Sequence, residues 1–329
     1  MLENPLLVDL KTQGVIPDVR IGLPMMMMPY PDGTFREGLN LEDIPVGVLR
    51  VLEENTYRDP FLLARGKAVP KMIRHICPDI LEPENLTEVD VEAILLAARL
   101  ARFGPTMRFK HTCQNPQPVG DKLCEQENEL VINLQEFILR YAPFDRLPEF
   151  QVTLPRLNQS VQLKPIRYGS AVRIMLRTME ATRRADALGD KPLEGALQDE
   201  AFLADYVGMV ERALLTDIES IRDSILYVSS RTGQKVHDPE FIERWLRAIP
   251  SDQIKMIRDK ARELFKVLRE IGQTRYACSA CGHDNIVQVQ LDPQRLFTPA
   301  EESDQPRTHS AASPSTGRKG KSHSRISRR

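Results

Sequence analysis

YACSACGHDNIVQVQL, residues 276–291, contains the cysteine pair Cys278 and Cys281, separated by two residues and followed by a glycine. In a knuckle of this form, backbone amides hold two thiolate sulfurs around Zn²⁺. A helical pattern precedes the pair, and the alternating stretch Ile286–Leu291 follows it. A redox CxxC lies instead between a strand and a helix, so this order of elements favours a zinc knuckle.

A structural zinc site has four ligands, and a second pair of cysteines lies in the other β-rich part of the chain. Cys124 opens CEQENELVINL and Cys281 opens CGHDNIVQVQL. In both segments an acidic residue and an asparagine precede an alternating apolar run that ends in leucine. We therefore expect the two pairs to hold one structural zinc ion. The expected ligands are Cys113, Cys124, Cys278 and Cys281.

Other reactive side chains give weaker signals. His111 and His283 are alternative metal ligands, although an exposed polar histidine is the simpler interpretation of each. Cys77 follows His75 in an apolar helical stretch, and we interpret it as a small buried hydrophobe because nothing nearby would activate it as a nucleophile. The motifs of P-loop, dinucleotide-binding, zinc-protease and serine-hydrolase enzymes are absent, so we expect no enzymatic activity.

Helical patterns dominate the stretch before the first cysteine pair. One helix is predicted to begin at Asp59-Pro60 and to be kinked or ended by Pro70. A second is predicted to follow Thr87 and to stop at Gly104. Further upstream, Met25–Met28 is interpreted as an adaptable packing segment inside the protein, rather than as a metal site or a promiscuous binding surface.

From Ser170 the pattern is helical again, with a polar break at 189–195. Asp238 is the predicted cap of a helix that holds Trp245, and Ser251 is the predicted cap of the next. The apolar residues of this last helix form one predicted stripe. They are Ile254, Ile257, Ala261, Leu264, Phe265 and Leu268.

Between the helical parts the apolar residues recur with a period of two. Met107 and Phe109 alternate with basic residues, and Glu129–Leu134 and Glu149–Leu154 are strand candidates. Phe150–Pro165 has the form of a hairpin. The predicted fold class is therefore α+β, mainly helical, with a small β-rich, zinc-ribbon-like module.

The predicted elements divide the chain into six parts. These are an extended segment at 1–40, a helical domain at 41–105, a β-rich module with the first cysteine pair at 106–168, a helical domain at 169–272, the CxxC knuckle returning to the β module at 273–300, and a disordered basic tail at 301–329.

The 45 lysines and arginines nearly balance the 46 acidic residues, but the charge is uneven. Residues 307–329 hold seven basic residues and no acidic one, which leaves 38 basic residues and a net charge of −8 on the rest. The tail composition predicts disorder.

No apolar run is long enough for a membrane span, the N-terminus is unlike a secretory signal, and five cysteines do not form a disulfide scaffold. We therefore expect the protein to be located in a reducing cytoplasm.

The order of these patterns resembles the baseplate hub assembly protein family of T-even-type contractile phages. The most characteristic block is FQVTLPRLNQSVQLKPIRYGSAVRIMLRTME at 150–180, a hairpin that runs into a helix. NLTEVDVEAILLAARLARFGPTMRF at 85–109 fits the helix before the first cysteine strand. The two cysteine segments and the closing Leu296-Phe297 fit as well, and Leu23-Pro24 is the earliest match. The resemblance covers about residues 86–298.

The resemblance implies a structural or assembly component of the baseplate hub, without catalytic activity. Its implied partners are other hub, wedge or tail proteins, and its implied locations are the host cytoplasm during assembly and the virion tail baseplate. The alternative is a zinc-ribbon nucleic-acid-binding protein that uses the basic tail, although a body of net charge −8 would repel nucleic acid. A thiol oxidoreductase is a third hypothesis, which tightly bound metal would exclude.

Overall fold

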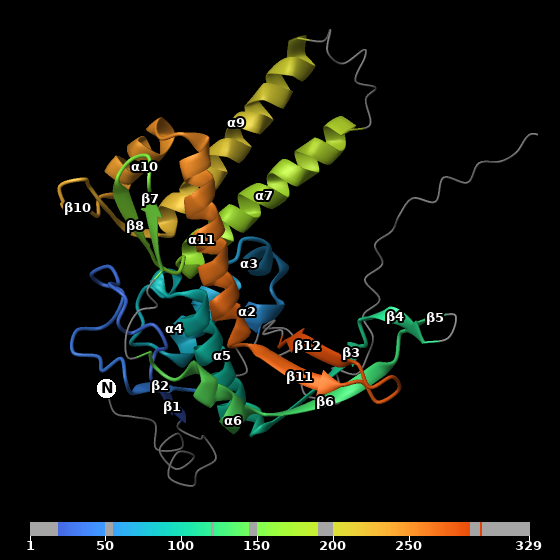
Figure 1. Ribbon diagram of the computed structural model, residues 1–329. Coiled ribbons are helices and arrows are strands. Elements are labelled where there is room, and N and C mark those ends of the chain that lie inside the picture. The colour runs from blue at the N-terminus through green and yellow to red at the C-terminus, as the bar shows by residue number, and fades with distance from the viewer. Residues whose placement is uncertain are drawn as a thin grey trace, which may run out of the picture.

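The computed structural model describes residues 19–49, 55–119, 122–144, 150–189, 200–289 and 297. It contains both helices and strands, with more helix than strand (Figure 1), as the sequence predicted. The predicted basic tail at 301–329 and all but the first residue of the polar break at 189–195 lie outside the described residues. Within the described part, no helix is both long and apolar enough to cross a membrane.

The first helical part begins with short helices. Helix α3 (Pro60–Ala64) starts at the predicted cap, where the Asp59 carboxylate accepts hydrogen bonds from two backbone amides. It ends at Ala64, and Pro70 lies in the first turn of the next helix, α4 (Ala68–Ile76), where a missing amide donor breaks no hydrogen bond. The prediction that Pro70 kinks or ends the first helix is therefore wrong. The other short helices here are α2 (Asn55–Arg58) and the 3₁₀ turn η1 (Pro83–Asn85).

Helix α5 (Glu88–Phe103) lies in the core. It begins at the predicted Thr87, in a capping box where the Thr87 hydroxyl accepts from the Asp90 amide and the Asp90 carboxylate accepts from the Thr87 amide. It ends at Gly104, whose φ of 78° favours glycine. Asp90 is fully buried and also accepts a hydrogen bond from the Met25 amide at 2.9 Å. The same carboxylate thus starts the helix and holds the N-terminal segment against it.

That N-terminal segment forms a two-stranded sheet beside α5. Strands β1 (Val19–Ile21) and β2 (Ile44–Val46) pair antiparallel. Between them Met25 and Met28 are 1% and 3% exposed, whereas Met27 is 54% exposed. The interpretation of the methionine run as packing is confirmed for the two buried members.

A four-stranded antiparallel sheet, in the order β10-β9-β8-β7, lies in the upper part of Figure 1. Strands β7 (Gln151–Leu154) and β8 (Gln159–Leu163) form the predicted hairpin. Strands β9 (Ile225–Ser229) and β10 (Lys235–Val236) extend the sheet in a region where the sequence predicted only helices. This prediction is wrong because β9 finds its partner in β8, with Val228 buried against Val161.

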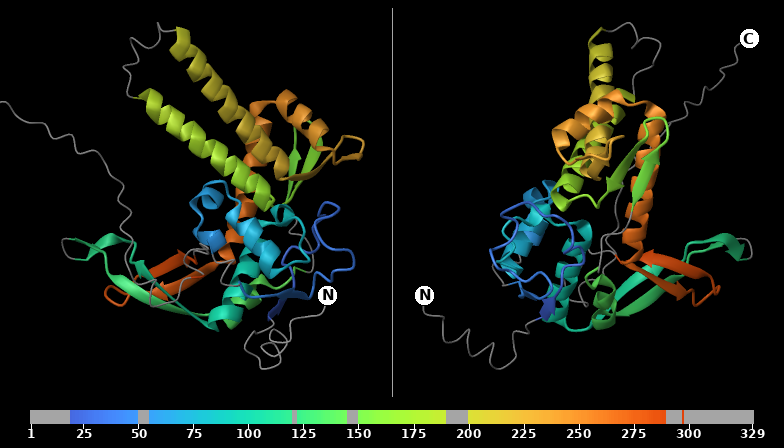
Figure 2. Two further views of the ribbon diagram at one scale, coloured as in Figure 1. Left: turned by 180° about the vertical axis from the view of Figure 1, so that it is seen from behind. Right: turned by 60° about the vertical axis from the view of Figure 1, so that its left-hand side comes forward.

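Helices α7 (Tyr168–Gly189) and α9 (Glu200–Asp223) run side by side and project beyond the rest of the protein (Figures 1 and 2). Helix α10 (Pro239–Ala248) follows the sheet and packs beside α9. Its predicted cap is confirmed, since the Asp238 carboxylate accepts from the amides of the first turn.

Helix α11 (Ser251–Glu270) runs along the sheet back toward the cysteine hairpins (Figure 1). Pro250 occupies the cap position of α11, and Ser251 is the first residue of the helix. No side chain caps this helix end, so the predicted Ser251 cap is wrong. The predicted stripe holds at Ile257 and Leu264, which are 0% and 3% exposed. Phe265 is 47% exposed, because the next position along a helix is rotated by about 100° out of the buried face.

Two further hairpins lie together at one end of the molecule (Figure 1). They are β3 (Thr106–Thr112) with β6 (Glu127–Asn133), and β11 (Gln273–Ala277) with β12 (Asp284–Gln288). A smaller hairpin of β4 (Asn115–Val119) and β5 (Lys122–Cys124) is inserted between β3 and β6. Helix α6 (Leu134–Ile138) and the turn η2 (Leu139–Tyr141) return the chain to one apolar core, which includes residues from Leu23 to Phe297.

Candidate metal centre

Each cysteine of the two predicted pairs lies at the tip of a hairpin. Cys113 directly follows β3 and Cys124 ends β5, while Cys278 directly follows β11 and Cys281 lies in the turn before β12. The structure brings the four together, with all Sγ atoms within 4.8 Å of one another. None of the four forms a disulfide bond.

The sulfur spacing fits a metal site. The Sγ atoms of Cys113 and Cys281 lie 3.7 Å apart, and those of Cys124 and Cys278 lie 3.8 Å apart. A tetrahedral zinc site with Zn–S distances of about 2.3 Å has S–S edges of about 3.8 Å, whereas a disulfide bond is about 2.05 Å long. Each close pair joins one hairpin to the other, so an ion held by all four sulfurs would clamp the two hairpins together.

The two hairpins repeat one local geometry. The amide of the first cysteine donates to the carbonyl two residues after the second cysteine: Cys113 to Gln126 and Cys278 to His283, each at 2.9 Å. The second loop is closed by Gly282, whose φ is 69° and whose amide donates to the Cys278 carbonyl at 2.9 Å. In the first hairpin, β4 and β5 are inserted between the cysteines, which explains the wide spacing of that pair.

Two asparagines connect the hairpins reciprocally. Asn128 on β6 donates from Nδ2 to the Sγ of Cys278, and Asn285 on β12 donates from Nδ2 to the Sγ of Cys113, both at 3.5 Å. Their carboxamide oxygens accept from backbone amides of the opposite hairpin, that of Ser279 at 3.0 Å for Asn128 and that of Gln114 at 2.9 Å for Asn285. Both asparagines are buried, at 7% and 4% exposure.

These asparagines are functional candidates that the sequence analysis did not single out. The signal was present, because the two cysteine segments share an asparagine four residues after their second cysteine. Each asparagine donates to a carbonyl of its own hairpin, Asn128 to Gln126 and Asn285 to His283, but the shared pattern could not predict that each also bonds across to the other hairpin.

Backbone amides favour the thiolate form in the second pair. Hydrogen bonds from the amides of Cys281 and Ala280 lower the pKa of Cys278 to about 6. The amide of His283 lowers the pKa of Cys281 below its usual value in the same way. Metal binding requires deprotonated cysteines, so the loop is suited to present two thiolates.

The remaining candidate residues are not part of the cluster of metal-ligand side chains. His111 has its Nδ1 2.9 Å from the hydroxyl of Tyr276, and the two rings meet edge to face. Among the described residues, the cluster of metal-ligand side chains at this place contains the four cysteines and neither His111 nor His283. Cys77 is 1% exposed in the core, where burial and the charge of Asp79 raise its pKa, in agreement with its interpretation as a small hydrophobe.

Comparison with known proteins identifies the family. The family model described as "T4 bacteriophage base plate protein" matches residues 55–298, a span that starts at α2 and includes both cysteine hairpins. No curated protein and no solved structure matches the chain. The resemblance drawn from the sequence is confirmed and extends further toward the N-terminus. This chain belongs to the T4 bacteriophage base plate protein family.

Proposed function

We propose that this protein is a structural or assembly component of the hub region of a contractile phage tail baseplate, acts through contacts with other baseplate or tail proteins, and contains a structural zinc site. Membership of the family supports the baseplate role. The observation that supports the zinc site is the cluster of four sulfurs, which joins a hairpin in the middle of the chain to one near its end.

The donor set favours a structural metal over a catalytic one. All four sulfurs converge, and a tetrahedral ion bound by four thiolates has no open position for water or substrate. The proposed ligands are Cys113, Cys124, Cys278 and Cys281. The sulfurs come from both hairpins, so the ion would hold the two hairpins together. Its proposed role is therefore structural and not catalytic.

A metal would supply stability that these hairpins lack. An isolated two-stranded hairpin is marginally stable in water, and both hairpins expose large apolar residues, Val131 at 61% and Ile286 at 55%. Structural zinc sites contribute apparent binding free energies of about 10–16 kcal/mol near neutral pH. The same exposed apolar side chains give the clamped hairpins a surface suited to protein contacts.

The assembly role is tested in a phage that lacks the gene. We expect tail assembly to stop before the sheath polymerises, and a mass-spectrometric inventory of complemented particles to find this chain together with hub proteins. Complementation by Cys278→Ser/Cys281→Ser should fail, whereas Cys77→Ala, which alters a cysteine outside the cluster, should restore plaques. Normal plaques from the null phage would refute the assembly role.

A further inference from the structure

A pocket with a volume of about 400 Å³ opens between helices α5, α9 and α11, beside the link from β8 to α7. Most of its lining is apolar. Val89, Ile221, Leu264 and Leu268 contribute to it and are each at most 6% exposed, while Phe265 also lines the pocket and is 47% exposed. Pockets in which proteins bind small molecules have this size and this kind of lining, together with a few polar groups.

One lysine in the lining of this pocket has no partner. Lys164 directly follows β8 and is partly buried. Among the residues that the structure describes, its ammonium group has neither a hydrogen bond nor an ion pair. Burial, and to a smaller extent the charge of Arg167, lower the pKa of Lys164. A buried charge without a counterion costs free energy, so the pocket contains a cation that the fold leaves uncompensated.

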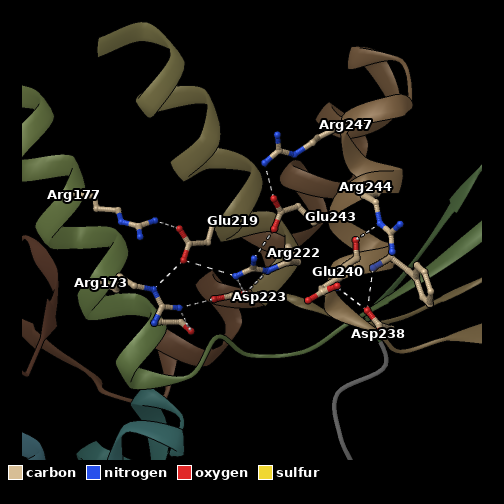
Figure 3. A network of polar contacts seen from close by, with 12 residues as sticks. Arg173, Arg177, Glu219, Arg222, Asp223, Asp238, Glu240, Glu243, Arg244 and Arg247 are labelled. Atoms are coloured by element: carbon tan, nitrogen blue, oxygen red, sulfur yellow. Dashed lines mark hydrogen bonds and ion pairs between the residues drawn. The ribbon is translucent and has the colours of Figure 1, made fainter. Parts of the chain in front are cut away.

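The acidic residue that could pair with this lysine is already engaged. Asp223 at the end of α9 favours the charged form of Lys164 through its own charge. Its carboxylate, however, accepts a hydrogen bond from Arg222 at 2.7 Å on one oxygen and pairs with Arg173 at 3.3 Å on the other (Figure 3). Two arginines therefore share the negative charge of Asp223, and Lys164 adds a further cation beside them.

A second hydrogen-bond donor of the pocket also lacks an acceptor. Arg258 on α11 lines the pocket, and its Nη2 donates to the carboxylate of Asp217. Its buried Nε has no hydrogen-bond partner among the residues that the structure describes. A carboxylate accepts several hydrogen bonds and supplies the negative charge that Lys164 lacks. These two side chains therefore favour a ligand with a carboxylate group.

The two glutamates of the pocket that lie on α5 are compatible with an apolar ligand body. Burial raises the pKa of Glu88, and it raises that of Glu92 to about 7, so burial favours the neutral form of both. The charge of Arg269, which also lines the pocket, opposes this shift in both residues. A neutral carboxyl group lies beside an apolar chain at a smaller cost than an ionised one.

We propose that this pocket binds an aliphatic monocarboxylate of the size of a medium-chain fatty acid. The ligand carboxylate pairs with Lys164 and accepts a hydrogen bond from Arg258, and the alkyl chain covers the apolar lining. None of the four clustered cysteines lines the pocket. The site goes beyond the proposed function and depends on neither the baseplate role nor the metal, because binding is measured on the purified chain alone.

The test is isothermal titration calorimetry of the full-length, delipidated protein with three probes that share one alkyl chain: decanoate, decanol and decyltrimethylammonium. Lys164→Met removes the ammonium group and keeps an unbranched side chain, and Ala171→Phe fills the pocket from α7. The matched control is Lys255→Met, which alters an exposed lysine of α11 that does not line the pocket. Circular dichroism and melting temperatures report whether each variant is folded.

We expect decanoate to bind the parent and the control with a Kd below about 1 mM, and to bind both pocket variants at least about 10-fold more weakly. Decanol should bind the parent at least about 10-fold more weakly than decanoate, and the cationic probe more weakly still. Without ligand, Lys164→Met should melt no lower than the parent, because it loses an unpaired charge.

Three results would overturn the proposal. The first is a parent that does not bind decanoate, or that binds decanol or the cationic probe at least as tightly. The second is parental decanoate affinity in both pocket variants. The third is a Lys164→Met variant that unfolds or melts clearly lower than the parent, which would show that Lys164 already has a counterion within the fold.

Discussion

Replacing Asn128 with alanine tests how strongly one hairpin of the cysteine cluster depends on the other. The Asn128 carboxamide accepts from the amide and the hydroxyl of Ser279 at 3.0 and 2.8 Å, and it donates to the Gln126 carbonyl at 3.0 Å and to the Cys278 sulfur at 3.5 Å. Because the residue is only 7% exposed, water cannot readily take over these bonds in the variant.

The first three contacts have ordinary hydrogen-bond lengths, and at about 1 kcal/mol each their loss amounts to about 3 kcal/mol. Ser279 lies inside the CxxC loop, so the loss of its bonds to Asn128 should also disturb the positions of the Cys278 and Cys281 sulfurs. Loss of a side chain that orients metal ligands typically weakens metal binding about 10–100-fold. We expect that range for Asn128→Ala, and a similar loss for Asn285→Ala because the two residues have equivalent contacts.

The assay is zinc competition against a chromophoric chelator on the full-length protein under reducing conditions, with the melting temperature recorded in parallel. Gln126→Ala is the matched control, because its side chain is exposed and, among the residues that the structure describes, bonds only to the neighbouring Glu127 carbonyl at 2.8 Å. Its zinc affinity should change less than about twofold. Parental zinc affinity in both asparagine variants would refute the view that the hairpins position each other's cysteines.

Three further predictions concern the core, the pH dependence and the tail. Ile257→Ala should lower the free energy of unfolding by about 2–5 kcal/mol because Ile257 is fully buried, whereas the half-exposed Phe265→Ala should cost less than half as much; denaturant titration compares them. Burial raises the pKa of Glu92 to about 7, although the Tyr141 hydroxyl donates to its carboxylate. The folded state therefore keeps a proton on Glu92 that the unfolded state releases near pH 4.5, so the free energy of unfolding falls as the pH rises from 4.5 to 7. The free energy of unfolding of Glu92→Gln should be higher than that of the parent by up to about 3 kcal/mol at pH 8, and should differ little from it at pH 4.5. Deleting residues 307–329 should leave the melting temperature unchanged, since that segment has almost no apolar side chains, and heparin retention of both forms tests the nucleic-acid alternative.

Features fixed by a few neighbouring residues could be predicted from the sequence. The caps at Asp59, Thr87 and Asp238 depend on a side chain and the amides two or three residues later, and all three are confirmed. The hairpin of β7 and β8 depends on alternation around a short turn and is confirmed as well. The repeated cysteine segments predicted that the two pairs belong together, and the structure places their sulfurs in one cluster. Zinc as the occupant stays a prediction.

Features that depend on distant partners could not be predicted. Strand β9 is short and follows a long helix, and it becomes a strand because β8 offers it hydrogen bonds from more than 60 residues away. The roles of Asn128 and Asn285 arise from contacts that span 150 and 172 residues. The exposure of Met175 and Leu214 likewise depends on how far α7 and α9 extend beyond the core, which no local pattern records.

The most direct test of the four-cysteine clamp is the metal content of the full-length protein, purified under reducing conditions without chelator. Elemental analysis should find about one zinc per chain in the parent and in Cys77→Ala, and should find it lost from Cys278→Ser/Cys281→Ser. Parent protein without metal, in which the four clustered cysteines all react as free thiols, would contradict the account.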